Sequence, residues 1–145
     1  MNNKTEKILW SIAIPGFGQL LNGKYIKGLV FILLEFVINV KAELNQAIML
    51  SFQGHIEKSI SVTNFQWLMF YPCVYMFAIW DAYRDAGGVA HPLSFVLAAY
   101  LGTVGIVYAP TFKVMGHLLG PVWLPLLFAM VGVLIGTFLR MKHHA

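Results

Sequence analysis

Residues 14–44 read IPGFGQLLNGKYIKGLVFILLEFVINVKAEL, and this stretch contains the two signals that decide the fold. Its first half is rich in glycine and small polar residues, which is typical of tight turns. Its second half is a run of about twenty mostly apolar residues, which is the length that a helix needs to cross a membrane. The order predicts a short, turn-rich segment followed by a transmembrane helix.

The composition of the whole chain indicates an integral membrane protein. Of the 145 residues, 59% are apolar and only 11% are charged. Soluble domains contain about 45–50% apolar and about 25% charged residues. So few charges cannot cover so much apolar surface, which argues against a soluble enzyme and against a disordered chain. The net charge of +4 fits basic residues at membrane surfaces better than binding of nucleic acid.

Four apolar segments have the length of transmembrane helices, namely residues 25–44, 65–83, 93–109 and 122–139. Residues 8–21 are also apolar, but this stretch is short and is interrupted by proline and glycine. The expected fold is therefore an all-α integral membrane protein with four transmembrane helices in a single domain. A short membrane-associated or re-entrant hairpin precedes these helices. On the last of them, Gly132 and Gly136 are spaced to permit close helix packing.

The positions of the basic residues set the expected topology. If residues 8–21 do not cross the membrane, one side holds seven lysine and arginine residues and the other side holds three; these are Lys4, Lys7, Lys24, Lys27, Arg84, Arg140 and Lys142 against Lys41, Lys58 and Lys113. If they do cross, five residues lie on each side. Cytoplasmic loops carry the excess of basic residues, so the uneven split predicts that both termini are cytoplasmic.

Residues 45–63 form the longest connection, which this topology places on the outer side of the membrane. Large apolar residues recur there at every fourth position, and polar residues fall mostly on the other faces, which predicts an amphipathic helix. Gly54 offers a place for a break in this helix. The apolar positions are Leu44, Ile48, Phe52, Ile56 and Ile60.

The hairpin motif comprises Pro15, Gly16, Gly18, Gln19, Asn22 and Gly23. The glycines allow positive φ angles and close approach of the backbone to neighbouring helices. The amide side chains can satisfy backbone groups that a turn leaves unpaired in a medium of low dielectric constant. These properties predict a tight turn in or near the membrane.

The pattern Pro-Gly-x-Gly-Gln-x-x-Asn-Gly-x-Tyr-x-x-Gly resembles the N-terminal hairpin of small bacterial multi-pass membrane proteins. It is also loosely similar to the two-helix transmembrane domain family, in which a glycine-rich hairpin precedes a span. The resemblance covers about residues 14–40. It implies a helical hairpin in the bacterial plasma membrane, and it supplies no catalytic residue.

Glu35 lies about ten residues into the first predicted transmembrane helix, near the middle of the bilayer. A carboxyl group at this depth is costly and often marks a functional site. Counting along the helices places Tyr75 and Tyr100 at similar depths, and Asn39 lies one turn further along the same helix face. Two interpretations stay open. One is a site for a proton or cation, and the other is a hydrogen-bonded contact that fixes helix packing.

Asp81, Arg84 and Asp85 end the second predicted transmembrane helix. Arg84 follows Asp81 by three residues, so the two side chains share a helix face and can form an ion pair. In the alternative interpretation, Arg84 binds a lipid phosphate while Asp81 faces Lys24 or Lys27.

Three classes of function remain, and none of them needs a cofactor or a metal, because the histidines and the single cysteine lack metal-ligand spacing. The first is a non-enzymatic accessory or scaffold subunit that contacts membrane lipids and packs against another membrane protein or itself. The second is a small transporter or channel subunit that uses Glu35. The third is a lipid-interacting enzyme at the inner membrane interface.

Overall fold

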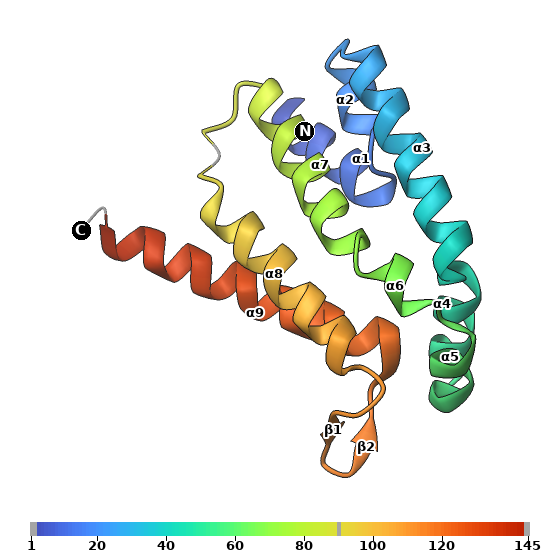
Figure 1. Cartoon of the computed structure of the whole chain (residues 1–145). Helices are drawn as coiled ribbons and strands as arrows, with labels where there is room; N and C mark the ends of the chain where they lie inside the picture. Colours follow the sequence, from blue (N-terminus) through green and yellow to red (C-terminus); the bar gives the residue numbers. More distant parts are fainter. Residues whose placement is uncertain (1–2, 90, 144–145) are drawn as a thin grey trace.

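The chain folds almost entirely into α-helices (Figure 1), as seen in a computed structural model that describes residues 3–89 and 91–143. The expected all-α class is confirmed. In chain order the helices are α1 (Asn3–Ala13), α2 (Phe17–Leu21), α3 (Tyr25–Ala42), α4 (Leu44–Phe52), α5 (Ile56–Val62), α6 (Phe65–Leu68), α7 (Tyr71–Asp85), α8 (Leu93–Tyr108) and α9 (Gly120–His143). A small antiparallel hairpin of β1 (Lys113–Val114) and β2 (His117–Leu118) connects α8 to α9.

Within the described residues, one helix is long and apolar enough to cross a membrane. It is the Gly120–Lys142 part of α9, which has 23 residues and whose most apolar stretch of 18 residues has a mean hydropathy of 2.3. Helix α8 is apolar but has only 16 residues, and α3 carries the charges of Lys27, Glu35 and Lys41. Length and hydropathy therefore do not support the predicted set of four transmembrane helices, although each predicted segment contains a helix.

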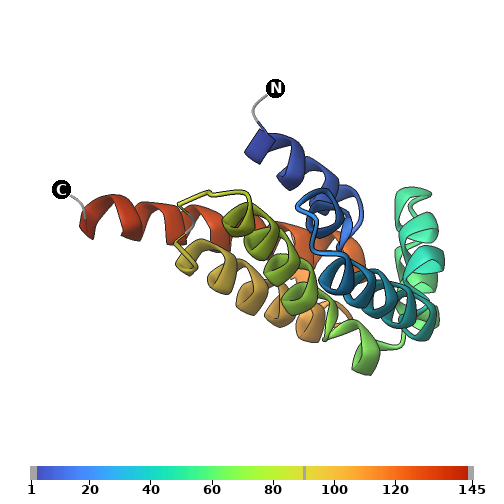
Figure 2. The ribbon, with the colours of Figure 1, turned by 90° about the horizontal axis from the view of Figure 1, so that it is seen from above.

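The long helices are arranged side by side, with α7 between α3 and α8 (Figures 1 and 2). Helix α9 packs antiparallel against α8, since Ser94 near the start of α8 lies 3.3 Å from Thr137 near the end of α9. Helices α1 and α2 lie beside α7 at the end of the molecule where α3 begins. At the opposite end, Ala42, Leu44, Leu68 and Ile106 form a small buried core.

The predicted apolar face of residues 45–63 is only partly buried within the molecule. Ile48 is 36% exposed and Phe52 is 68% exposed, whereas Ala47 and Leu50 are buried. The cause lies at Glu43, which takes a left-handed conformation with φ of 57° between α3 and α4 and so resets the direction of the helix.

The expected break at Gly54 is confirmed. This residue has φ of 80° and separates α4 from α5, which fold back against each other. The hydroxyl groups of Ser51 and Ser59 are 2.9 Å apart and hold the two short helices together. The indole Nε1 of Trp123 donates to the carbonyl of Ser51 at 3.3 Å, which ties this pair of helices to α9.

The second predicted transmembrane segment is broken just before Pro72. Helix α6 ends at Leu68, and Pro72 occupies the first turn of α7. A proline is tolerated there because the backbone N–H that it lacks would have no partner within the helix.

Glycine brings α8 and α9 into close contact. A Cβ atom on Gly132 would lie 2.5 Å from the carbonyl oxygen of Leu97, and one on Gly136 would lie 2.5 Å from the Cα of Ser94. These distances are shorter than a van der Waals contact, and the opposing atoms belong to the backbone. The small residues at a spacing of four thus pack α9 against α8, as the sequence predicts.

We expect Gly132→Val to lower the free energy of unfolding by about 1–3 kcal/mol, because the added side chain would force the two backbones apart. Denaturant unfolding of the protein in detergent measures this change. Val133→Ala is the matched control, since Val133 is the next residue and is 40% exposed. Equal stability of the two variants would contradict the close packing of α8 and α9.

Candidate functional site

The segment before α3 forms a helical hairpin, in which the end of α2 lies beside the first half of α1. Pro15 and Gly16 make the turn between α1 and α2, and Gly16 has φ of 107°. The ammonium group of Lys7 donates to the carbonyl of Leu21 at 2.8 Å, which joins the first half of α1 to the end of α2. Gly23, with φ of 74°, then turns the chain into α3.

Two glycines of the motif let this hairpin touch both neighbouring helices. A Cβ atom on Gly16 would collide with the carbonyl oxygen of Gly28 in α3. A Cβ atom on Gly18 would collide with the hydroxyl of Ser11, and it would lie 2.8 Å from the Cβ of Ala82 in α7. The glycines therefore serve close helix contact on two sides of the hairpin.

The amide side chains of the motif bind the end of α7. Gln19 is completely buried, and its Nε2 donates to the carbonyl of Ala78 at 2.7 Å and to Oδ2 of Asp81 at 3.2 Å. The Nδ2 of Asn22 donates to the carbonyl of Ala82 at 2.8 Å. The hairpin is thus attached to α7 by three hydrogen bonds that its two amide side chains donate.

Asp81 lies at the centre of an ion-pair network at this end of the molecule. Its side chain is only 2% exposed, and Lys27 Nζ lies 2.9 Å from its Oδ1. Lys27 also contacts Oδ2 of Asp85 at 2.8 Å, and a guanidinium nitrogen of Arg84 lies 3.1 Å from Oδ1 of Asp81. The structure therefore contains both the Asp81–Arg84 pair and the Asp81–Lys27 contact, whereas Lys24 is exposed.

The hydrogen bonds of Asp81 leave this carboxylate little freedom for chemistry. Oδ1 accepts from Lys27 and Arg84, and Oδ2 accepts from Lys27 and Gln19. A carboxylate can accept about four hydrogen bonds, so all its sites are used. Burial of a carboxylate is costly unless it is paired in this way. The arrangement is suited to holding helices together and is poorly suited to general acid–base catalysis.

Glu35 lies on α3 and faces Tyr71. The hydroxyl of Tyr71 donates to Oε1 of Glu35 at 3.4 Å, and the ring of Tyr71 stacks on the ring of Tyr75 with 5.5 Å between centroids. Oε2 of Glu35 is buried and has no hydrogen-bond partner within the part of the chain that the structure describes. Glu35 is therefore the one carboxylate among the described residues with a buried oxygen that no donor satisfies.

Of the other residues of the predicted intramembrane group, Asn39 and Tyr75 lie near the Glu35 carboxylate and interact with it, although each also has a hydrogen-bond partner elsewhere. The hydroxyl of Tyr75 donates to the carbonyl of Ile12 at 2.6 Å, and the Nδ2 of Asn39 donates to Asn45 at 3.1 Å. Tyr100 is 65% exposed. The sequence analysis missed Tyr71, although it lies one turn before Tyr75 on the same face of α7.

In comparisons with known proteins, no family model, no curated protein and no solved structure matches this chain. The resemblance of the hairpin motif to small bacterial membrane proteins thus stays a prediction. The function has to be inferred from the geometry of the hairpin, the Asp81 network and Glu35.

We expect Lys27→Gln to lower the free energy of unfolding by about 1–3 kcal/mol, because Asp81 and Asp85 would lose a shared cation while Asp81 stays buried. Chemical denaturation in detergent measures the loss. Lys24→Gln removes the same charge from the adjacent turn, where the side chain is exposed, and should change stability by less than about 0.5 kcal/mol. If both variants were equally stable, the network would not be a stabilising contact.

Proposed function

We propose that this chain is a small, non-enzymatic, multi-pass membrane protein that acts as an accessory or scaffold subunit. It would pack against another membrane protein or against a second copy of itself. One observation carries this proposal. The buried carboxylate of Asp81 is fully bonded within the molecule, while the outer faces of the long helices are apolar and uncovered.

The exposed apolar surface supports a location in the membrane. On α3, seven large apolar side chains between Leu29 and Val40 are 40–65% exposed; these are Leu29, Val30, Leu33, Leu34, Phe36, Val37 and Val40. Helix α9 is similar, since only 17% of its most apolar stretch is buried. A soluble monomer rarely exposes so large a continuous apolar surface.

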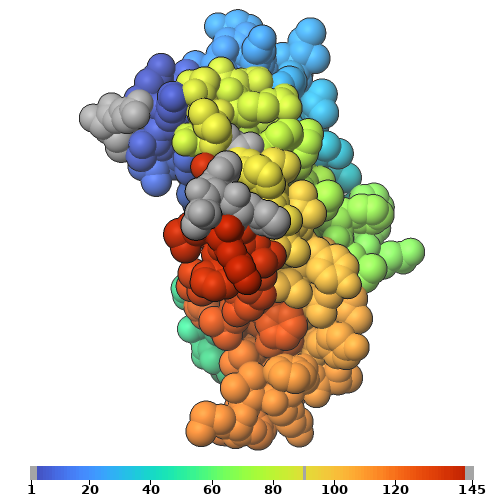
Figure 3. Space-filling view, turned by 90° about the vertical axis from the view of Figure 1, so that its left-hand side faces the viewer, coloured from blue at the N-terminus to red at the C-terminus, as the bar shows by residue number. Residues whose placement is uncertain are grey.

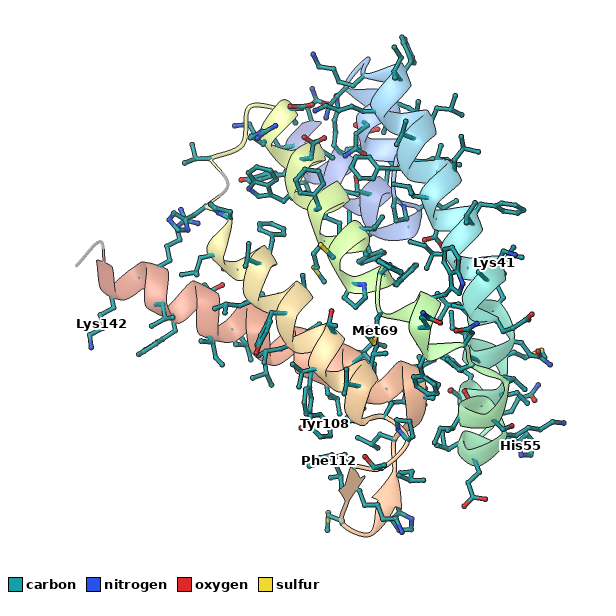
Figure 4. The ribbon with its side chains drawn as sticks, in the orientation of Figure 1. Lys41, His55, Met69, Tyr108, Phe112 and Lys142 are labelled. Carbon is teal, nitrogen blue, oxygen red and sulfur yellow. The ribbon has the colours of Figure 1, made fainter. Side chains whose placement is uncertain are left out.

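The proposed topology has four spans, formed by α3, by α6 together with α7, by α8 and by α9. Helices α1 and α2 would form a re-entrant hairpin, in which α1 enters the bilayer from the cytoplasmic side and α2 returns to the cytoplasmic side. Lys41 at the end of α3 and Lys142 at the end of α9 lie at different ends of the molecule (Figure 4). Helix α8 is about 24 Å long, a few ångströms less than the hydrocarbon core, which local thinning of the bilayer can accommodate.

The proposed location is a bacterial plasma membrane with both termini in the cytoplasm. The apolar faces of α3 and α9 would contact lipid, a partner or a second copy. An enzymatic role at the inner interface has less support, because Asp81, Arg84 and Asp85 are bonded to one another and to Lys27.

A second candidate function is supported by Glu35. Its buried Oε2 without a donor is the kind of group that a transporter uses to carry a proton or cation. In this alternative the chain would be a small transporter or channel subunit. The contact with Tyr71 would then orient the carboxylate rather than fix the packing of α3 on α7.

We expect single cysteines introduced in a Cys73→Ser background to report the four-span topology. A membrane-impermeant maleimide should label Lys58→Cys and Met115→Cys in intact cells, because both positions are exposed on the proposed outer side. Lys24→Cys and Val89→Cys should react only after the membrane is permeabilised. Labelling of positions 89 and 115 from the same side would show that α8 does not cross.

Native mass spectrometry of the protein extracted gently from its own membrane tests the scaffold role. We expect a stoichiometric complex with a second polypeptide or with a second copy, and this complex should persist in Glu35→Gln. The transporter would be favoured instead if the protein is a monomer and carries cations into liposomes. This flux should then be lost in Glu35→Gln and kept in Glu43→Gln. Glu43 is the matched control because it is exposed at the far end of the same helix.

A further inference from the structure

Helices α7 and α8 enclose an apolar groove of about 290 Å³. One wall is formed by side chains of α7 between Cys73 and Trp80, and the other by side chains between Pro92 and Ala99 at the start of α8. Phe77 and Val96 are 50% and 58% exposed, so the groove is open along one side of the molecule. No described side chain fills this space.

The groove ends toward the middle of the molecule, where α7 and α8 approach each other closely. Toward the middle of the molecule the two helices meet, since a Cβ atom on Gly102 would lie 3.2 Å from the Cβ of Pro72. At the other end lies the connection from Ala86 to Pro92, which the proposed topology places at the cytoplasmic surface. Figure 3 shows the face on which the end of α7 and the start of α8 lie next to each other.

The volume of the groove suits a single hydrocarbon chain. The groove offers about 290 Å³ along two turns of α8. A flexible chain without hydrogen-bonding groups can enter, because the walls are lined by apolar side chains.

At the Trp80 end of the groove, the half-exposed Arg84 lies in a cluster in which two cations, Lys27 and Arg84, face the carboxylates of Asp81 and Asp85. The guanidinium group of Arg84 lies 4.4 Å from the ring centroid of Trp80, which itself lines the groove. Arg84 is 49% exposed, and it donates to Asp81 through one nitrogen. A guanidinium group has five N–H donors, so Arg84 can bind a phosphate while it keeps this ion pair.

We propose that the groove between α7 and α8 binds one acyl chain of an anionic phospholipid from the inner leaflet, with the lipid phosphate on Arg84. This inference rests on the proposed membrane location. The acyl chain would lie along Phe77 and Val96 and end at the contact between Pro72 and Gly102. A bound lipid would fill the space between the two helices.

Tryptophan fluorescence tests this proposal. The reporter protein retains Trp80 and has Trp10, Trp67 and Trp123 replaced by phenylalanine, and it is reconstituted in phosphatidylcholine vesicles. Phosphatidylglycerol brominated on its acyl chains should quench Trp80 at about a fivefold lower fraction of the membrane than brominated phosphatidylcholine, since one arginine near the surface gives about that preference for anionic lipid. A second reporter that retains only Trp67 should respond equally to both lipids.

Two variants separate the charge of the site from its shape. Arg84→Gln should abolish the preference for phosphatidylglycerol, whereas Lys24→Gln should keep it, because Lys24 lies outside the groove. Ala99→Phe should weaken quenching by both lipids by filling the narrow part of the groove. This substitution leaves the Asp81 network intact, so it still tests the groove if Arg84→Gln fails to fold.

Equal quenching of Trp80 by the two lipids would overturn the lipid site while leaving the membrane location in place. Absence of quenching for both reporters with both lipids would instead overturn the proposed membrane location itself. A preference that survives both Arg84→Gln and Ala99→Phe would also reject the groove as the binding site.

Discussion

The arrangement of the helices at one end of the molecule depends on the buried carboxylate of Asp81. A carboxylate with 2% exposure is stable only when donors replace the water that it has lost. Those donors come from Gln19 in α2, Lys27 in α3 and Arg84 in α7. The hairpin, α3 and α7 must therefore all be in place together, which makes this end of the fold one cooperative unit.

The close contacts of the hairpin follow from the same constraint. Gln19 reaches Asp81 only because Gly18 lets the hairpin approach α7, and Gly16 lets it approach α3. The rest of the molecule is held differently, by a small apolar core where α3, α4, α6 and α8 meet and by the glycine contacts between α8 and α9. Between these two ends, α3 exposes an apolar face, and this combination is the basis for proposing a scaffold in the membrane.

Much of the fold could be predicted from the sequence, because long apolar runs and turn residues are local signals. The pairing of Asp81 with Lys27 was also accessible as one of two alternatives, since Asp81 lies near the end of one predicted helix and Lys27 near the start of another, on the same predicted side. The contact of Glu35 with Tyr71 was not, because counting along a helix ignores the break before α7. The turn between α3 and α4 was not predicted either, because no local signal in the sequence marks the left-handed conformation of Glu43.

A double-mutant cycle between Lys27 and Asp81 measures whether the buried carboxylate holds α3 to α7. The free energy of unfolding would be measured in detergent for Lys27→Met, Asp81→Asn, the double variant and the unmodified protein. We expect a coupling energy of at least about 1 kcal/mol, because each single variant leaves the partner's charge without its main contact. Additive effects within about 0.5 kcal/mol would show that the two residues are independent and that Asp81 does not hold the helices together through Lys27.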